Sequence, residues 1–211
     1  MFFSLSVFAV LCSQLGLGPD EKMRERKKPT LIATTAKENV LALAVGSLHN
    51  LALVGPKRAV WSWGCNDDEA LGRSTDEWLP APVAGPLGSG DSEALPGGTA
   101  QIFCGASHSL ALSAQGDVYS WGTYRDANGV IGFTDTVDAA KEPTKLTALP
   151  AGTKVVHVAA GEAHDVLLTE KGEGQWTVGI WTMSCVFTSP ASHPFPALSI
   201  VSLALSSVPV G

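Results

Sequence analysis

The sequence lacks an apolar run long enough to cross a membrane. A spanning helix needs about 20 consecutive apolar residues. The apolar stretch at 197–210 is shorter than that and is interrupted by serines and a proline. Residues 1–13 are apolar over about the length of a signal-peptide core, but no basic residue precedes that core. We therefore expect neither a membrane partner nor secretion.

Cysteine is scarce, and acidic residues outnumber basic ones. Closely spaced cysteine pairs are missing, which favours a reducing compartment over a disulfide framework (Cys12, Cys65, Cys104 and Cys185). The formal net charge of −6 argues against general affinity for phosphate backbones. The basic residues of 22–28 are interleaved with acids, so we interpret this stretch as a solvated loop. A contact with nucleic acid or an importin is the alternative for it.

Motifs for covalent chemistry are also missing. The sequence contains no Gly-rich phosphate loop, no metal-spaced cluster and no nucleophile elbow. The carboxylates of Asp67, Asp68 and Glu69 follow an expected strand end, and we interpret them as solvated. The sequence thus predicts a protein that is not an enzyme and uses no cofactor or small-molecule substrate.

What the sequence does contain is an internal repeat. The segments "GSLHNLAL", "GASHSLAL" and "GEAHDVLL" recur with a period of about 58 residues. A Trp-Gly pair follows the first two of them at the same period. The repeated positions, to which we assign structural roles, are Gly46, His49, Trp63, Gly64, Gly105, His108, Trp121, Gly122, Gly161 and His164.

Each unit is predicted to form strands. "SLALSAQGDVYSW" alternates apolar and polar residues on both sides of a Gly-containing turn, which indicates a hairpin. "TAQIFCG" and "KVVHVAAG" precede two of the hairpins and suit buried inner strands. Because helical periodicity is absent, we expect an all-β protein whose repeated sheets are blades of a β-propeller. One histidine per blade would be dispersed around a ring, which favours hydrogen-bonded structural roles over a metal site.

The chain resembles the regulator of chromosome condensation family. The segments that carry the resemblance are "QLGLG" (14–18), "ERKKP" (25–29), "WGCNDDEALGR" (63–73) and "RDANGVIGF" (125–133). It implies a seven-bladed propeller acting as a guanine-nucleotide exchange factor for the small GTPase Ran. It covers residues 14–172, about three blades, so we expect an incomplete propeller. Residues 1–13 do not match, and 173–211 are expected to be a diverged, irregular tail.

The resemblance also implies a β-wedge, a hairpin that enters the nucleotide-binding region of the GTPase. Its residues here would be Arg125, Asp126, Asn128, Gly129, Val130 and Ile131. Asn128 and Gly129 suit the positive-φ pair of a type I′ turn, and Val130 and Ile131 are stiff and apolar. Residue chemistry alone leaves open an ordinary exposed hairpin between blades.

Two positions depart from the family pattern. The resemblance implies acids on the GTPase-facing side where Ala106 and Ala163 stand. Glu162 and Asp165 flank Ala163 and its histidine and are candidate partner-face acids in their place. The alternative function is therefore a propeller that binds chromatin or protein without exchange activity, or a truncated fragment. The resemblance implies a Ran-like partner, possible chromatin binding without the family's basic tail, and a nuclear and cytoplasmic location.

Overall fold

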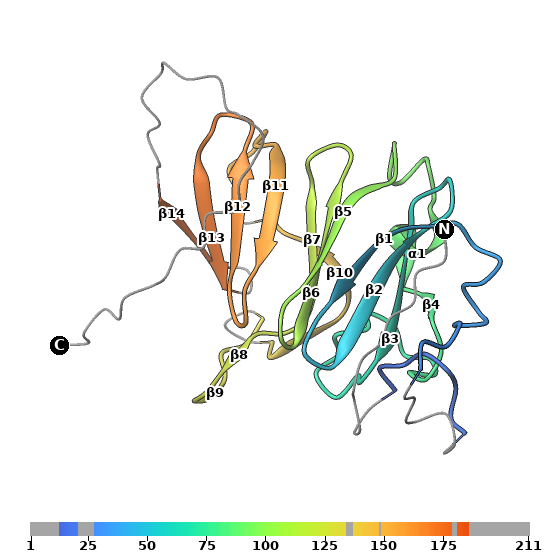
Figure 1. Cartoon of the computed structure of the whole chain (residues 1–211). Coiled ribbons are helices and arrows are strands. Elements are labelled where there is room, and N and C mark those ends of the chain that lie inside the picture. Colours follow the sequence, from blue (N-terminus) through green and yellow to red (C-terminus); the bar gives the residue numbers. More distant parts are fainter. Residues whose placement is uncertain (1–12, 21–27, 134–136, 148, 179–180, 186–211) are drawn as a thin grey trace.

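Three antiparallel sheets make up the computed structural model, which describes residues 13–20, 28–133, 137–147, 149–178 and 181–185. They lie side by side in chain order (Figure 1). The first sheet contains β1 (Val40–Val45), β2 (His49–Val54), β3 (Ala59–Gly64) and β4 (Ala81–Pro82). The second contains β5 (Thr99–Cys104), β6 (His108–Ser113), β7 (Val118–Thr123) and β10 (Ala139–Lys145). The third contains β11 (Val155–Ala160), β12 (Asp165–Thr169), β13 (Gly174–Val178) and β14 (Trp181–Cys185).

Two smaller elements complete the described chain. The two-stranded ribbon of β8 (Arg125–Asp126) and β9 (Gly129–Val130) follows β7. A five-residue helix, α1 (Gly85–Ser89), has Pro86 in its first turn and ends at Gly90, whose φ of 61° is left-handed. The expectation of an all-β fold made of successive propeller blades is confirmed. No helix in the described part of the chain is long and apolar enough to cross a membrane.

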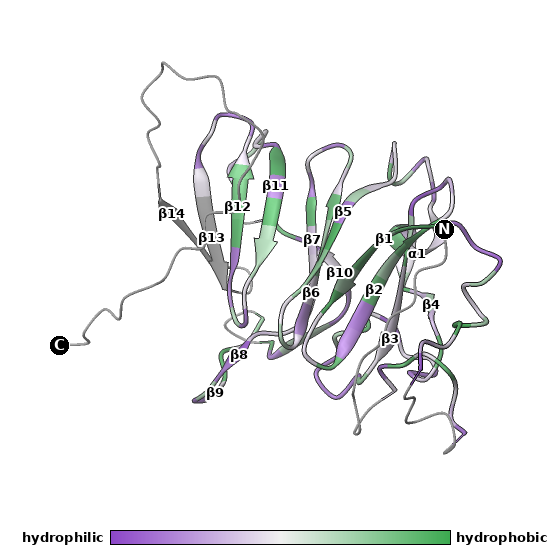
Figure 2. Cartoon of the chain, viewed as in Figure 1, coloured by the Kyte–Doolittle hydropathy of each residue, from purple (hydrophilic) through white to green (hydrophobic). Residues whose placement is uncertain are grey.

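The core lies between the sheets. Successive side chains of a strand point to opposite faces of its sheet, so a sheet with a neighbour on each side can pack apolar side chains against both. Leu51 and Leu53 of β2 pack against the second sheet, where Ala111 of β6 faces them. Leu110 and Leu112, on the other face of β6, pack against the third sheet. Figure 2 shows apolar residues gathered on the strands and polar residues on many of the connecting loops. β2 and β6 are buried along their whole length, as central strands between two layers should be.

The outer face of the first sheet is also covered. Ala52, Val54 and Trp63 are buried there, and Ile32 of the preceding segment packs against them. A short turn that contains Gln14 caps this side. The Gln14 carbonyl accepts hydrogen bonds from Asn50 Nδ2 at 3.0 Å and from Trp63 Nε1 at 2.9 Å.

The same contact, in which one carbonyl accepts a tryptophan N–H and a side chain of the central strand, recurs as a joint between the first and second sheets. The Ala70 carbonyl accepts hydrogen bonds from Ser109 Oγ and Trp121 Nε1, both at 2.9 Å. The repeated tryptophan therefore ties the first and the second sheet to the segment that precedes each of them. This contact gives a physical reason for the recurrence of Trp63 and Trp121, since a buried indole N–H needs an acceptor.

The part of the 173–211 tail that the structure describes forms strands rather than the expected irregular structure, while residues 186–211 lie outside the described residues. Residues 174–178 and 181–185 form β13 and β14, which extend the third sheet. The physical reason is that β11 pairs with only one edge of β12. The backbone N–H and C=O groups along the other edge can bond a further strand whatever its side chains are. Register still departs from the repeat. Thr177 lies opposite Asp165, the position that Trp63 and Trp121 occupy opposite Asn50 and Ser109, so Trp176 is one residue out of register.

Candidate functional site: the hairpin after the second sheet

The β8–β9 hairpin projects from the end of the second sheet (Figure 1). Arg125 pairs with Val130, and Asp126 pairs with Gly129. All residues from 125 to 131 are exposed, including the two large apolar side chains, Val130 at 47% and Ile131 at 45%. The structure thus brings the expected wedge residues together in one exposed hairpin. Exposed neighbouring aliphatic side chains on a projecting element are suited to contact a partner.

The turn of this hairpin differs from the sequence-based expectation. Because Asp126 pairs with Gly129, the central turn residues are Ala127 and Asn128 rather than Asn128 and Gly129. Asn128 does not have a positive φ, whereas Gly129 has a φ of 131°. The type I′ prediction is therefore wrong. The Asp126 carboxylate explains the shift, since it accepts a hydrogen bond from the Asn128 backbone N–H at 2.7 Å and stabilises the turn one residue earlier.

Two buried aromatic residues anchor the base of the hairpin. Tyr124 directly precedes β8 and is fully buried, while Phe133 follows β9 and is 3% exposed. Their rings lie 6.2 Å apart. The backbone N–H groups of Ile131 and Gly132 both donate to the Tyr124 carbonyl, at 2.8 and 3.2 Å. The exposed tip is thus held by a closed, buried base. Sequence reasoning included Phe133 in the hairpin segment without a role of its own and missed Tyr124, although an aromatic residue on each side of a charged, exposed turn is a usable signal.

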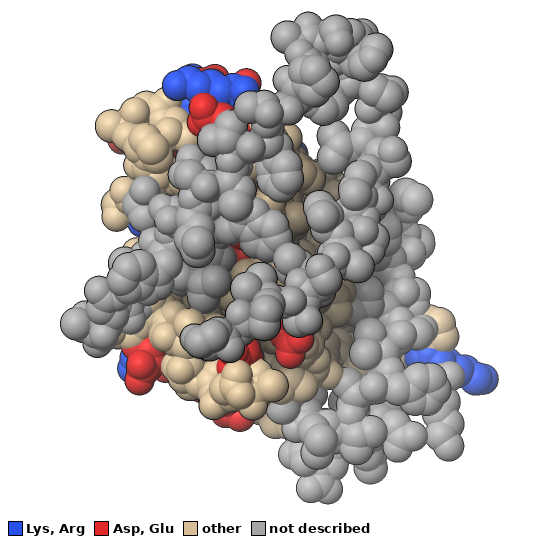
Figure 3. Space-filling model, turned by 90° about the vertical axis from the view of Figure 1, so that its left-hand side faces the viewer, with Lys and Arg blue, Asp and Glu red and all other residues tan. Residues whose placement is uncertain are grey.

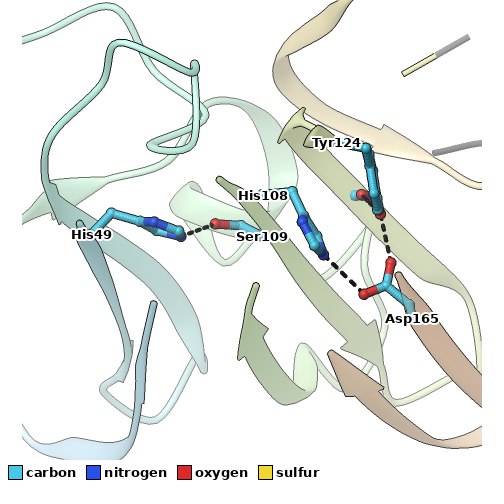
Figure 4. Close-up of polar contacts among 6 residues, drawn as sticks. His49, His108, Ser109, Tyr124 and Asp165 are labelled. Atoms are coloured by element: carbon cyan, nitrogen blue, oxygen red, sulfur yellow. Dashed lines mark hydrogen bonds and ion pairs between the residues drawn. The ribbon is translucent and has the colours of Figure 1, made fainter. Parts of the chain in front are cut away.

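A buried polar network continues from Tyr124 into the third sheet (Figure 4). The Tyr124 hydroxyl donates to Asp165 Oδ2 at 2.6 Å, and the other carboxylate oxygen lies 2.9 Å from His108 Nε2. The Tyr124 and His108 rings are stacked with their centroids 4.1 Å apart. Asp165 has no exposed surface. Asp165 therefore does not lie on an exposed partner-binding face as expected, because its side chain is directed toward the second sheet, as that of Ser109 is directed toward the first.

The corresponding joint one sheet earlier is neutral. His49 Nε2 lies 2.9 Å from Ser109 Oγ, so His49 reaches the residue that follows the next repeated histidine, as His108 does (Figure 4). Burial of the imidazole, with the nearby charge of His108 as a smaller cause, lowers the pKa of His49 from 6.5 to about 4. His49 is consequently uncharged at neutral pH.

Carboxylates lie at the same end of the molecule as the hairpin, and one of them contacts it. Asp68 forms an ion pair with Arg125 at 3.3 Å, and Asp67 and Glu162 are exposed. The Glu162 carbonyl accepts a hydrogen bond from the Ala106 backbone N–H at 3.1 Å, which places Glu162 beside one of the two alanines. Figure 3 shows Asp and Glu residues along the lower end of the molecule, the end from which the hairpin projects in Figure 1. An apolar tip with acids around it suits a partner surface that is both apolar and basic.

The described residues offer little support for a metal site or for a ligand pocket. Within the described residues, no group of three His, Cys, Asp or Glu side chains is placed to bind a metal ion. A hollow of about 370 Å³ lies at the opposite end of β7, lined by residues 116–118, 145–147 and 149–153. Its charged pair, Lys145 and Asp117, is joined at 2.9 Å, and both side chains are substantially exposed. The hairpin and its buried base are the better candidate site.

Comparison with known proteins identifies the repeats of this chain. The family model described as "Regulator of chromosome condensation (RCC1) repeat" matches residues 59–112 and 115–168. The human "Regulator of chromosome condensation" is 36% identical over 82% of this chain. The Saccharomyces cerevisiae "Guanine nucleotide exchange factor SRM1" is 31% identical over 82% of it. A crystal structure of yeast RCC1 (Prp20) bound to Kap60 superposes with a TM-score of 0.69 at 35% identity over 78% of this chain.

The match covers only part of each relative. The chain spans 36% of the human protein, 42% of the yeast exchange factor and 39% of the Prp20 chain in the crystal structure. The repeat period, the three stacked sheets and these matches agree with one another. The chain belongs to the family of proteins built from regulator of chromosome condensation (RCC1) repeats.

Proposed function

We propose that this chain contributes the wedge of a guanine-nucleotide exchange factor that acts on a Ran-type small GTPase. The observation that carries the proposal is the pair of exposed side chains, Val130 and Ile131, on a hairpin with a buried base. One relative is named as a guanine nucleotide exchange factor. The same yeast protein, Prp20p from Saccharomyces cerevisiae, is described in another crystal structure with binding properties to Gsp1p and histones. A nuclear location follows from the same proposal and stays a prediction.

The mechanism needs no covalent step. A hairpin that binds the nucleotide-free GTPase more tightly than the loaded form lowers nucleotide affinity by the same factor. Val130 and Ile131 supply apolar contact, and a fixed base limits the conformational entropy that the hairpin loses on binding. Arg125 and Asp126 flank the tip and can form polar contacts with the partner. Magnesium and nucleotide would belong to the GTPase.

The test measures release of fluorescent GDP from Ran in the presence of the 211-residue chain. Changing both Val130 and Ile131 to Asp should reduce the acceleration at least tenfold, because burying two unpaired carboxylates in an apolar contact costs more than the roughly 1.4 kcal/mol that a tenfold change requires. Val156→Asp is the matched control, since Val156 is 49% exposed on a different element, β11. Thermal unfolding of each variant checks that the fold is retained. An unchanged rate in the double variant, or no acceleration by the unaltered chain, would exclude the exchange function.

The second candidate function is a protein-binding module without exchange activity. The observation that favours it is the absence of a carboxylate at Ala106 and Ala163, where a charge-assisted bond to a basic partner would otherwise form. The exposed acids Asp67 and Glu162 remain available to such a partner. Binding of nucleotide-free Ran or of histones without faster GDP release would support this function over the first.

A further inference from the structure

We propose that Asp165 is a positioning residue for the hairpin. It holds Tyr124 from the third sheet, and Tyr124 in turn fixes the direction in which β8 and β9 project. The inference rests on the proposed function only for its effect on GDP release. Its structural part, that the hydrogen bond between Tyr124 and Asp165 joins the third sheet to the hairpin, can be tested independently.

A buried hydrogen bond joins the Tyr124 side chain to Asp165. The Tyr124 hydroxyl and Asp165 Oδ2 lie 2.6 Å apart, and neither residue has exposed surface. A short hydrogen bond to a carboxylate is about twice as strong as a neutral one. The Tyr124 hydroxyl also lies 2.8 Å from Ser120 Oγ, so it is held from β7 and from β12. The Tyr124 ring has little freedom to move without breaking these contacts.

The main chain of Tyr124 is bonded to the hairpin. The Tyr124 carbonyl accepts the backbone N–H groups of both Ile131 and Gly132, which close the hairpin at its base. The side chain of one residue is therefore bonded to the third sheet while its main chain is bonded to the hairpin. No other residue stands between the two connections.

The Asp165 carboxylate bonds His108 and Tyr124 at the same time. His108 Nε2 lies 2.9 Å from Oδ1, and the His108 ring stacks on Tyr124 at an interplanar angle of 20° (Figure 4). Within the described structure, His108 Nδ1 has no hydrogen-bond partner. Nε2 is therefore the His108 atom through which this joint is made. A carboxylate offers two acceptor oxygens, one for each partner, which the hydroxyl of a serine at this position does not.

The corresponding residues between the first and second sheets are used differently. Ser109 takes the place of Asp165 and bonds His49 and the Ala70 carbonyl. Asn66 stands where Tyr124 does, two residues after the Trp-Gly pair, and its side chain bonds Leu71 N and Arg73 O within its own loop. The side chain two residues after the Trp-Gly pair is thus bonded to the next sheet in the loop that carries the hairpin, whereas one sheet earlier it is bonded within its own loop.

Tyr124→Phe tests the inference, because it removes only the hydroxyl. Ser109→Ala is the matched control, since it removes a fully buried hydrogen bond from the other joint. Backbone amide hydrogen exchange of Ile131 and Gly132, measured by NMR, should become about tenfold faster in Tyr124→Phe and stay within about twofold in Ser109→Ala. In the GDP-release assay, Tyr124→Phe should lower kcat about fivefold and change KM less than about twofold, because the tip keeps its contact residues but not its direction.

Asp165→Leu should loosen the same two amides, and the double variant should be no looser than either single variant. Equal amide rates in Tyr124→Phe and Ser109→Ala would overturn the inference, as would additive effects of Tyr124→Phe and Asp165→Leu. If the unaltered chain does not accelerate GDP release, the proposed function fails, while the amide measurements still decide whether Asp165 positions the hairpin.

Discussion

Gly72 illustrates how closely one residue can be constrained by a repeated joint. Its φ is +63°, and a Cβ added there would lie 2.7 Å from Trp121 Nε1 and 2.8 Å from Cδ1. Trp121 is fully buried and donates to the adjacent Ala70 carbonyl. The indole therefore cannot move away without losing its hydrogen bond. Glycine is required at this position both for its backbone conformation and for the space that it leaves.

Gly72→Ala should accordingly lower the free energy of unfolding by about 2–4 kcal/mol. Of this, about 1–2 kcal/mol comes from the left-handed backbone and the rest from overpacking against Trp121. Gly55→Ala is the control, because Gly55 has a φ of +68° but no atom near its added Cβ. It should cost only the backbone part. Urea unfolding of the two variants measures the difference, and equal losses would show that the Trp121 contact does not constrain the position.

The sequence predicts some of these residue roles and misses others. The period alone indicates that His49 and His108 are structural, because equivalent positions in successive sheets do not converge. The charge of Asp165, taken by itself, predicts a surface position. Its register predicts burial correctly, since Asn50 and Ser109 occupy the same position and both are polar and buried. A charged side chain in a repeated polar position is better interpreted by the repeat than by its charge.

At the scale of the element, the hairpin turn offers a direct test of its register. With Asp126 and Gly129 paired, Ala127 is the second residue of the four-residue turn, a position that favours proline in type I turns. Asp at the first position and Gly at the fourth are also typical of that turn. The side chain of Asp126 adds a hydrogen bond to the Asn128 N–H. These features together favour the observed turn over a type I′ turn.

Ala127→Pro should therefore be tolerated and should stabilise the chain by up to about 1 kcal/mol, because it restricts the unfolded chain at a compatible position. Asn128→Pro is the contrasting variant. It should loosen the hairpin, because the ring removes the N–H that Asp126 accepts and is disfavoured at the third position of a type I turn. Thermal unfolding and amide exchange of Ile131 measure both effects. A hairpin loosened by Ala127→Pro would indicate that the turn is centred on Asn128 and Gly129 after all.

The remaining elements show where sequence patterns stop being informative. Alternating runs and Gly-containing turns predict β6 and β7 well, because side-chain alternation and turn chemistry agree there. They give no reason to expect β13 and β14, whose pairing depends on the backbone edge left by β12. α1 is too short to show helical periodicity, and its Leu87 is buried in the core between the first two sheets.

At the scale of the molecule, a repeated histidine joins each of the first two sheets to the next one, and its partner differs between the two joints. His49 meets a neutral serine, whereas His108 meets a carboxylate. In an array of sheets that contact only their neighbours, stability depends on each joint as well as on each sheet. Acid should therefore affect the joint between the first and second sheets through His49. His108 is the titratable group beside it, and its charge also opposes protonation of His49.

The direction of the effect follows from the pKa. Because the pKa of His49 is lowered from 6.5 to about 4 in the folded chain, the unfolded chain binds an extra proton between these two values. The contribution of His49 to stability is complete above pH 6.5, declines as the pH falls, and shows no further loss below about 4. Between about pH 7 and pH 5 the loss should be about 2 kcal/mol. His49→Gln, which cannot titrate, should remove that part of the pH dependence while keeping a polar group near Ser109. Urea unfolding of both chains at these two pH values measures the difference. Parallel pH profiles would mean that His49 takes up its proton as readily in the folded chain as in the unfolded one, and that this joint does not resist protonation.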